Sequence, residues 1–94
     1  MVRYTVKPDQ VARNEELVRD VYSELARERP EGLRYGTFRL DDGVSFVHVV
    51  DEEGDGGKVQ VSEAFQRFTA SLVEDRCADT PQLHQMTLVG SYSG

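Results

Sequence analysis

The stretch from Leu33 to Val50, LRYGTFRLDDGVSFVHVV, decides the fold of this chain. Apolar residues alternate with other residues on both sides of Asp41-Asp42-Gly43, which predicts two β-strands, 33–40 and 44–50, joined by a short turn. An Asp-Gly pair tolerates the positive φ angles that tight hairpin turns require. The sequence therefore predicts an antiparallel hairpin at the centre of a sheet.

The two faces of this hairpin differ, because side chains alternate along a strand. The short loop pairs odd residues of one strand with even residues of the other. One face is apolar, and we expect it to pack beneath helices: Gly36, Phe38, Leu40, Val47 and Val49. The other face mixes aromatic and polar groups: Tyr35, Thr37, Arg39, Phe46, His48 and Val50. A strand that is apolar on both sides needs cover on both sides, so we expect a second copy of the chain on this mixed face.

The segment before the hairpin predicts a strand and a helix. Residues 2–7 alternate, as in a half-buried strand, and a helix is expected over 10–29 with Asp9 as its N-cap. The buried stripe of this helix should consist of Val11, Asn14, Val18, Val21, Tyr22 and Leu25. Two interpretations of Asn14 stay open: it caps a helix that starts at Glu15, or its amide points into a cavity.

The segment after the hairpin predicts a loop, a helix and a strand. Residues 51–58, DEEGDGGK, form an acidic, glycine-rich loop whose spacing matches neither a calcium loop nor a phosphate loop. A helix over 63–76 with Ser62 as its N-cap and a strand over 82–92 should follow. The buried stripe of the second helix should consist of Ala64, Phe65, Phe68, Thr69, Leu72 and Val73.

The predicted order of elements is β-α-β-β-α-β, which places the chain in the α+β class. Two helices on one face of a four-stranded antiparallel sheet make a ferredoxin-like fold, here as a single domain over residues 1–94. The exposed sheet face predicts a homodimer that packs sheet against sheet.

Composition narrows the classes of function. The net charge of −6 argues against binding to nucleic acid or to anionic membranes, which both need a basic surface. The two histidines, His48 and His84, have no carboxylate at ligand spacing, so we expect no metal site. Cys77 is the single cysteine, which allows no internal disulfide and fits the reducing cytoplasm.

Three segments carry a resemblance to a known family: VRYTVKPDQVARNEELV (2–18), ELARERPEGLRY (24–35) and TFRLDDGVSFVHV (37–49). With the order of elements, they resemble the antibiotic-biosynthesis-monooxygenase-type (ABM) domain, whose members are dimeric α+β barrels. The family includes cofactor-independent oxygenases that act on polycyclic aromatic substrates, haem-degrading enzymes and many small proteins of no established activity. The resemblance implies the same fold and a homodimer.

The catalytic residues of that family do not carry over to this chain. Its catalytic members use a tryptophan and an asparagine in the pocket, and the haem degraders add a histidine on the second helix. This chain has no tryptophan and no histidine between residues 63 and 76, and Asn14 lies on the first predicted helix.

The first functional hypothesis is a cofactor-independent monooxygenase acting on a small aromatic or polyketide-like substrate in the barrel cavity. His48 would act as general base, and Arg39 would stabilise an enolate or phenolate oxygen. The carbanion would react with oxygen directly, without a cofactor. The expected substrate-binding residues are Tyr35, Thr37, Phe46 and Asn14.

Two alternatives stay open beside the enzyme. The chain could be a non-catalytic, pathway-accessory dimer that holds a small metabolite, with His48 and Arg39 as structural neighbours. In the other alternative, side chains fill the cavity and the dimer itself is the functional unit. The sequence leaves open whether the last strand exchanges between subunits.

Overall fold

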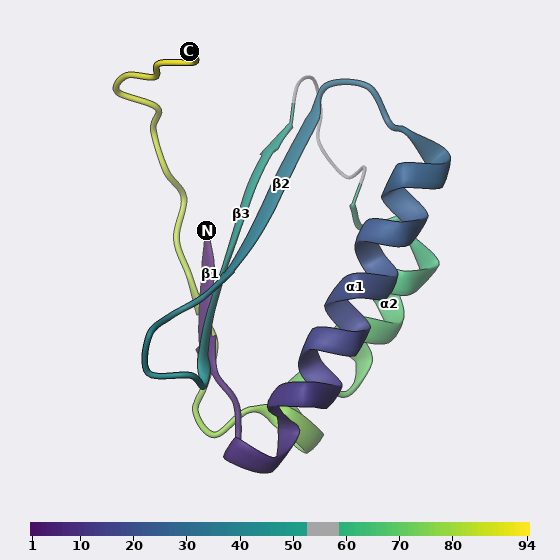
Figure 1. Cartoon of the computed structure of the whole chain (residues 1–94), viewed down its shortest axis with the longest axis vertical. Helices are drawn as coiled ribbons and strands as arrows, with labels where there is room; N and C mark the ends of the chain where they lie inside the picture. The colour runs from purple at the N-terminus through teal and green to yellow at the C-terminus, as the bar shows by residue number, and fades with distance from the viewer. Residues whose placement is uncertain (53–58) are drawn as a thin grey trace.

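The computed structural model describes residues 1–52 and 59–94, which form one antiparallel sheet with two helices (Figure 1). The strands are β1 (Val2–Thr5), β2 (Leu33–Arg39), β3 (Ser45–Glu52) and β4 (Gln82–Leu83), and the α-helices are α1 (Val11–Glu28) and α2 (Glu63–Ala70). A short 3-10 turn, η1 (Pro8–Gln10), precedes α1, and a π-helical turn, η2 (Leu72–Arg76), follows α2.

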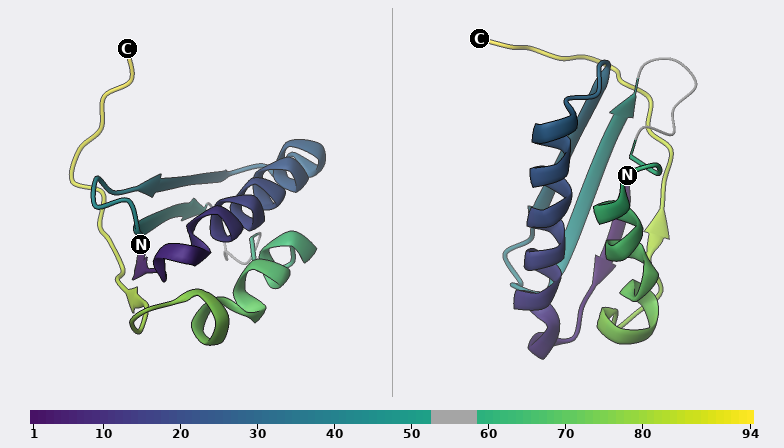
Figure 2. Two further views of the ribbon diagram at one scale, coloured as in Figure 1. Left: turned by 60° about the horizontal axis from the view of Figure 1, so that its bottom comes forward. Right: turned by 90° about the vertical axis from the view of Figure 1, so that its right-hand side faces the viewer.

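The strand order in the sheet is β2-β3-β1-β4, and every neighbouring pair is antiparallel. Both helices lie on the same face of the sheet, as the view from the helical side shows (Figure 2). This α+β arrangement is compatible with the predicted ferredoxin-like fold. None of the described helices is long and apolar enough to cross a membrane.

The central hairpin has the predicted pairing. Thr37 lies opposite His48 and Arg39 opposite Phe46, so odd residues of β2 pair with even residues of β3. Gly43 adopts a φ of +80°, which glycine reaches without steric cost. The turn is held further by a carboxylate oxygen of Asp42, which accepts hydrogen bonds from the backbone N–H groups of residues 44 and 45 at 3.0 and 2.8 Å.

The prediction of which hairpin face packs beneath the helices is wrong. Phe46 and His48 are 2% and 5% exposed on the helix-facing side, whereas Phe38 on the outer side is 59% exposed. The outer face therefore carries the set expected inside: Gly36, Phe38, Leu40, Val47 and Val49. The reason is that β1 places Tyr4 opposite Phe46, and this tyrosine extends the mixed face into an aromatic core. Tyr35, Thr37 and His48 of that face are buried or half-buried, and they bind one another.

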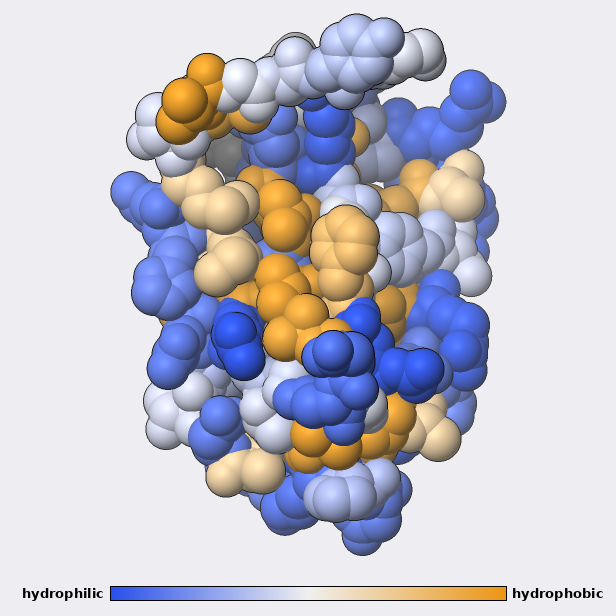
Figure 3. Space-filling model, turned by 60° about the vertical axis from the view of Figure 1, so that its left-hand side comes forward, coloured by the Kyte–Doolittle hydropathy of each residue, from blue (hydrophilic) through white to orange (hydrophobic). Residues whose placement is uncertain are grey.

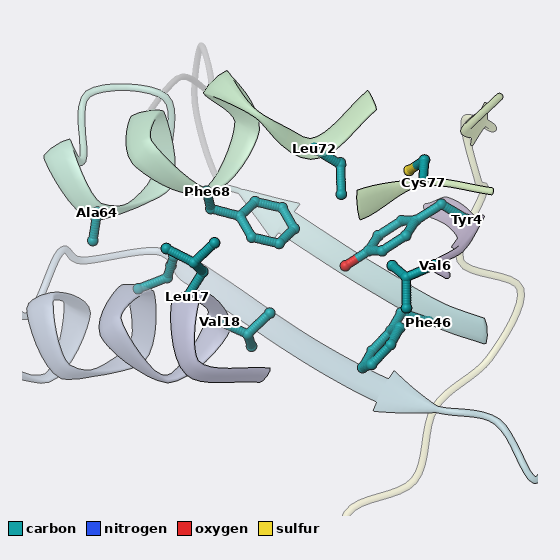
Figure 4. Packing of buried hydrophobic residues seen from close by; sticks show 10 residues of the cluster. Tyr4, Val6, Leu17, Val18, Phe46, Ala64, Phe68, Leu72 and Cys77 are labelled. Atoms are coloured by element: carbon teal, nitrogen blue, oxygen red, sulfur yellow. The ribbon is translucent and has the colours of Figure 1, made fainter. Parts of the chain in front are cut away.

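The core fills the space between this inner face and the two helices (Figure 4). Tyr4 and Phe46 stack with ring centroids 5.7 Å apart, and Phe68 of α2 closes over Tyr4 at 6.2 Å. The other buried members of this cluster are Val6, Leu17, Val18, Val21, Ala64, Leu72 and Cys77. Aromatic rings from both layers thus surround the inner side of the sheet.

Helix α1 starts differently from the prediction. Asp9 lies in the turn η1, and Gln10 occupies the N-cap position without a side-chain hydrogen bond to the helix. Asn14 lies inside the helix and is 0% exposed, so the interpretation of Asn14 as a cap is wrong. The helix ends at Arg29, which adopts a left-handed φ of 52° and closes the last turn through its backbone N–H.

Helix α2 begins as predicted but ends early. The hydroxyl of Ser62 accepts a hydrogen bond from the N–H of Phe65 at 3.1 Å, which confirms Ser62 as the N-cap. The α-helical hydrogen bonding stops at Ala70 and is replaced by the π turn η2. This change rotates the later residues, so Val73 is 60% exposed instead of lying in the buried stripe. Thr69, still within α2, is exposed as well.

The last strand is shorter than predicted. β4 comprises only Gln82–Leu83, and pairing with β1 stops where the backbones of Met1 and His84 exchange two hydrogen bonds. Residues 84–94 then run away from the sheet as an exposed segment (Figure 1). At the other end of the hairpin, β3 continues to Glu52, and the rest of the predicted acidic loop, 53–58, lies outside the described residues.

Candidate functional site: a polar cluster in an aromatic cavity

A cavity of about 230 Å³ lies between the inner face of the sheet and α2. Its lining is mostly apolar and comes from both layers, with Tyr4, Tyr35, His48, Phe65, Phe68 and Leu72 among its residues. A larger depression of about 390 Å³ lies between the ends of the two helices, but charged side chains such as Glu24, Arg27 and Glu28 line much of it. A concave, mostly apolar site with a few polar groups is typical of small-molecule binding.

His48 is the centre of the polar groups in this cavity. Its Nε2 lies 2.7 Å from the hydroxyl oxygen of Tyr4, and its Nδ1 lies 2.7 Å from the hydroxyl oxygen of Tyr35. The hydroxyl of Thr37 lies 3.2 Å from the same Nδ1 and 2.8 Å from the hydroxyl of Tyr22. Both ring nitrogens of the buried histidine therefore have protein partners.

The sheet register brings these groups together. Thr37 is directly opposite His48 in the β2–β3 pair, and Tyr35 is two residues along β2 on the same face. Tyr4 reaches His48 diagonally, since its direct partner across the β1–β3 pair is Phe46. Three adjacent strands thus each contribute to one cluster.

The ionisable groups of the cluster are held in their neutral forms. Burial lowers the pKa of His48 from 6.5 to about 4, so its imidazole is uncharged at pH 7. Burial also raises the pKa values of Tyr4 and Tyr35 well above the ordinary value of tyrosine. The cavity therefore presents neutral hydrogen-bonding groups at physiological pH.

A second layer of polar residues lies behind Tyr4. The Nδ2 of Asn14 donates to the Tyr4 hydroxyl at 3.0 Å, and the Nε of Arg76 donates to the Oδ1 of Asn14 at 2.9 Å. Arg76 is 1% exposed, and its guanidinium also donates to Ser71 and to the carbonyl of Phe68, whose ring it covers. Within residues 1–52 and 59–94, no carboxylate forms an ion pair with this buried cation.

The structure brings together some of the predicted site residues and separates others. Tyr35, Thr37 and His48 form the cluster, and Asn14 joins it through Tyr4. Phe46 lies in the core, stacked on Tyr4, and does not line the cavity.

Within the described residues, Arg39 makes no hydrogen bond to His48. Its side chain is half exposed and donates to Glu15 of α1 at 2.6 Å. Arg39 is two residues from Thr37 along β2, as Tyr35 is in the other direction, but its side chain extends to Glu15 and not to His48. The arginine that contacts the cluster is Arg76, through Asn14.

Sequence reasoning missed Tyr4, Phe68 and Arg76 as members of the site. Arg76 had a detectable signal, because it continues the apolar stripe of Phe68 and Leu72 at a spacing of four residues. A charged residue on a buried stripe needs buried partners. Tyr4 had a weaker signal, as a hydroxyl on the inward side of a predicted strand.

The described residues contain no cluster of three or more histidine, cysteine, aspartate or glutamate side chains suited to a metal ion. Cys77 is free and buried, and burial raises the pKa of its thiol.

In comparisons with known proteins, no family model, no curated protein and no solved structure matches this chain.

Proposed function

We propose that this chain binds a small aromatic or polyketide-like molecule in the cavity beside His48, without a cofactor. The ligand would carry a carbonyl, phenol or enol oxygen that accepts a hydrogen bond. One observation supports this proposal above all: an aromatic cavity encloses a histidine and two tyrosines that cannot use all their hydrogens on one another.

The three side chains His48, Tyr4 and Tyr35 carry more polar hydrogens than the hydrogen bonds between them use. A neutral His48 has one ring hydrogen, and the Tyr4 and Tyr35 hydroxyls have one each, whereas two hydrogen bonds join the three side chains. If Nδ1 carries the ring hydrogen, the hydroxyl hydrogen of Tyr35 is left over from these two bonds, with the Thr37 hydroxyl and a ligand oxygen as its available acceptors. If Nε2 carries the ring hydrogen, the hydroxyl hydrogen of Tyr4 is left over. Both hydroxyls belong to residues that line the cavity, so a ligand oxygen can accept the remaining hydrogen.

A matched pair of probes tests this proposal. Acetophenone and isopropenylbenzene have nearly the same shape, but the first carries an oxygen where the second carries a CH₂ group. We expect acetophenone to bind about fivefold more tightly in calorimetry, since one hydrogen bond contributes about 1 kcal/mol. Equal affinities would contradict the proposed acceptor site.

The position of the site is tested by blocking the cavity. Thr69 is exposed and lines the cavity, whereas Val73, four residues later, is exposed and does not line it. Thr69→Trp should abolish binding of acetophenone, and Val73→Trp should leave it unchanged. If Thr69→Trp retained full affinity, the ligand would bind elsewhere on the chain.

Cofactor-independent oxygenation of the bound molecule is the second candidate. It is favoured by the neutral state of the buried His48 at pH 7 and by its place in the cavity lining. In this role, His48 would remove a substrate proton and the carbanion would react with dioxygen. His48→Ala should then abolish oxygen uptake with little change in ligand affinity, whereas a purely binding protein would consume no oxygen in either form.

We further propose that the protein is a cytoplasmic homodimer of the dimeric α+β-barrel kind, distantly related to ABM domains. The order of elements and of strands supports this relationship. The outer sheet face supports the dimer, because it exposes Phe38 beside the partly exposed Val47 and Val49. Figure 3 brings this side of the molecule forward and shows apolar side chains gathered over its middle.

The dimer proposal predicts that Phe38→Asp yields a monomer, because a charge at the centre of an apolar interface is left unpaired. Light scattering coupled to size exclusion measures the mass directly. Val73→Asp is the control, since Val73 is 60% exposed against 59% for Phe38 but lies on the helical side. The proposal fails if the unmodified chain is monomeric or if Phe38→Asp keeps the mass of a dimer.

A further inference from the structure

The buried Arg76 fixes the orientation of the neighbouring amide. A guanidinium has only donors, so the atom of Asn14 that faces Arg76 Nε at 2.9 Å must be the carbonyl Oδ1. The reverse orientation would place the NH₂ group of Asn14 against the N–H of Arg76, with two donors facing each other. The NH₂ group of Asn14 therefore points to Tyr4 and donates to its hydroxyl oxygen.

The orientation of Asn14 fixes the hydrogen of Tyr4 in turn. The Tyr4 hydroxyl has two partners within the described residues, Asn14 and the Nε2 of His48. Because it accepts from Asn14, the partner left for its own hydrogen among the described residues is Nε2. With Nε2 protonated, the Tyr4 hydrogen would have no partner there, whereas with Nε2 bare the Tyr35 hydrogen still has Thr37, so the unprotonated Nε2 is favoured. Burial keeps the pKa of His48 near 4, so at pH 7 the ring carries a single hydrogen, and this hydrogen is on Nδ1.

The hydrogen on Nδ1 is donated to the hydroxyl oxygen of Tyr35 at 2.7 Å. Tyr35 then acts as acceptor toward His48, so its own hydrogen can go to the hydroxyl of Thr37 or to a ligand oxygen in the cavity that Tyr35 lines. The same assignment leaves His48 without a bare nitrogen on the side of Tyr35, because its one unprotonated nitrogen accepts from Tyr4.

We infer that Arg76 is a positioning residue that directs the hydrogen-bond chain Arg76–Asn14–Tyr4–His48–Tyr35, so that the cavity offers a hydrogen-bond donor from Tyr35. This inference rests on the proposed function and narrows its ligand to compounds that present an acceptor oxygen to Tyr35. It also assigns His48 to orienting Tyr35 rather than to removing a substrate proton.

The π turn η2 gives a structural reason for the position of Arg76. The N–H of Cys77 bonds to the carbonyl of Leu72 at 2.8 Å, five residues back, so this turn contains one residue more than an α-helical turn. At its end, Arg76 is buried with its guanidinium over the ring of Phe68. π turns inside helices are often found at functional sites.

The ring protonation of His48 tests the inference in the protein without ligand. Two-bond ¹H–¹⁵N correlation spectra distinguish a protonated ring nitrogen from a bare one, and a His84→Gln background removes the signals of the other histidine. We expect Nδ1 to be protonated and Nε2 to be bare at pH 7. An Nε2-protonated ring would overturn the inference, whether or not any ligand binds.

Asn14→Asp should reverse the whole chain with almost no change in shape. A carboxylate accepts from Arg76 and from the hydroxyl of Tyr4, so Tyr4 can accept only from a protonated Nε2 of His48. We expect the ring hydrogen to move to Nε2 and the preference for acetophenone over isopropenylbenzene to disappear. A ring that stays protonated on Nδ1 in this variant would contradict the directing role.

A second pair of variants keeps the test decisive if Asn14→Asp does not fold. Arg76→Lys retains a buried donor and should keep His48 protonated on Nδ1. Arg76→Met removes the donor, so Asn14 can turn over and the ring should show both protonated forms. If Arg76→Met keeps the pure Nδ1 form, Arg76 does not direct the chain. A failure of acetophenone to bind would affect the proposed function alone, since the spectra are recorded without it.

Discussion

Replacing Phe68 by alanine should lower the free energy of unfolding by about 3–5 kcal/mol, the range observed when a buried phenylalanine is truncated. Phe68 is 3% exposed, and its ring packs against His48 at 5.1 Å, Phe65 at 6.1 Å and Tyr4 at 6.2 Å. It also lies beneath the guanidinium of Arg76. Truncation would remove the contact between the helical layer and the polar cluster. Urea denaturation measures the loss.

The matched control for this change is Val73→Ala. Val73 lies five residues after Phe68 but is 60% exposed, so its truncation should change the free energy of unfolding by less than about 0.5 kcal/mol. If Phe68→Ala cost no more than the control, Phe68 would not hold the two layers together.

Acidification should destabilise the protein between pH 6.5 and pH 4 through His48. Burial lowers the pKa of this residue from 6.5 to about 4 in the folded state, so the unfolded chain takes up a proton in this range and the folded chain resists it. The contribution of His48 is therefore complete above about pH 6.5 and is lost as the pH falls to 4. One unit of pKa corresponds to 1.36 kcal/mol, so the loss is about 3 kcal/mol.

The variant His48→Gln isolates this effect, because glutamine does not titrate and can still bond to Tyr4 and Tyr35. Such a control is needed because other groups also make the folded protein less stable in acid. Hydrogen bonds from Ser62 and Ser45 lower the pKa values of Glu24 and Asp42, and protonation of these carboxylates destabilises the fold. We expect the unmodified chain to lose about 3 kcal/mol more than His48→Gln over this interval in denaturation curves. If the free energies of unfolding of the unmodified chain and of His48→Gln changed in parallel with pH, His48 would not be buried in its neutral form.

The sequence predicted the features that depend on neighbouring residues. The hairpin pairing follows from the length of the Asp41–Gly43 turn, and the cap at Ser62 follows from a serine before a helical stripe. Tyr35, Thr37 and His48 were placed on one face because alternation and register are local properties. These predictions needed no knowledge of the rest of the fold.

The sequence could not predict which hairpin face is buried. Counting apolar residues favoured the face of Phe38, but the buried face satisfies its polar groups through distant residues. The buried His48 has a hydrogen-bond partner in Tyr4, which lies 44 residues before it in the sequence. The buried Asn14 has one in Arg76, which lies 62 residues after it. Pairing of this kind is a tertiary property, and a sequence pattern does not contain it.

The predictions for Arg39 and for the last strand failed for a related reason. Arg39 was expected beside His48, but its position on the strand lets it reach Glu15 of α1 instead. Residues 82–92 alternate as a strand should, yet beyond Leu83 they have no strand beside them in the sheet. A strand pattern specifies a conformation only when a partner supplies the hydrogen bonds.

The central claim is that the cavity beside His48 holds a small aromatic molecule with its oxygen toward Tyr35. Intermolecular nuclear Overhauser effects between acetophenone and the ¹³C-labelled protein test this claim most directly. We predict contacts from the ligand ring to Phe65, Phe68 and Val59, and contacts from its methyl group to the ring of Tyr35. Contacts confined to exposed side chains such as Leu88, or no contacts at saturating ligand, would contradict the account.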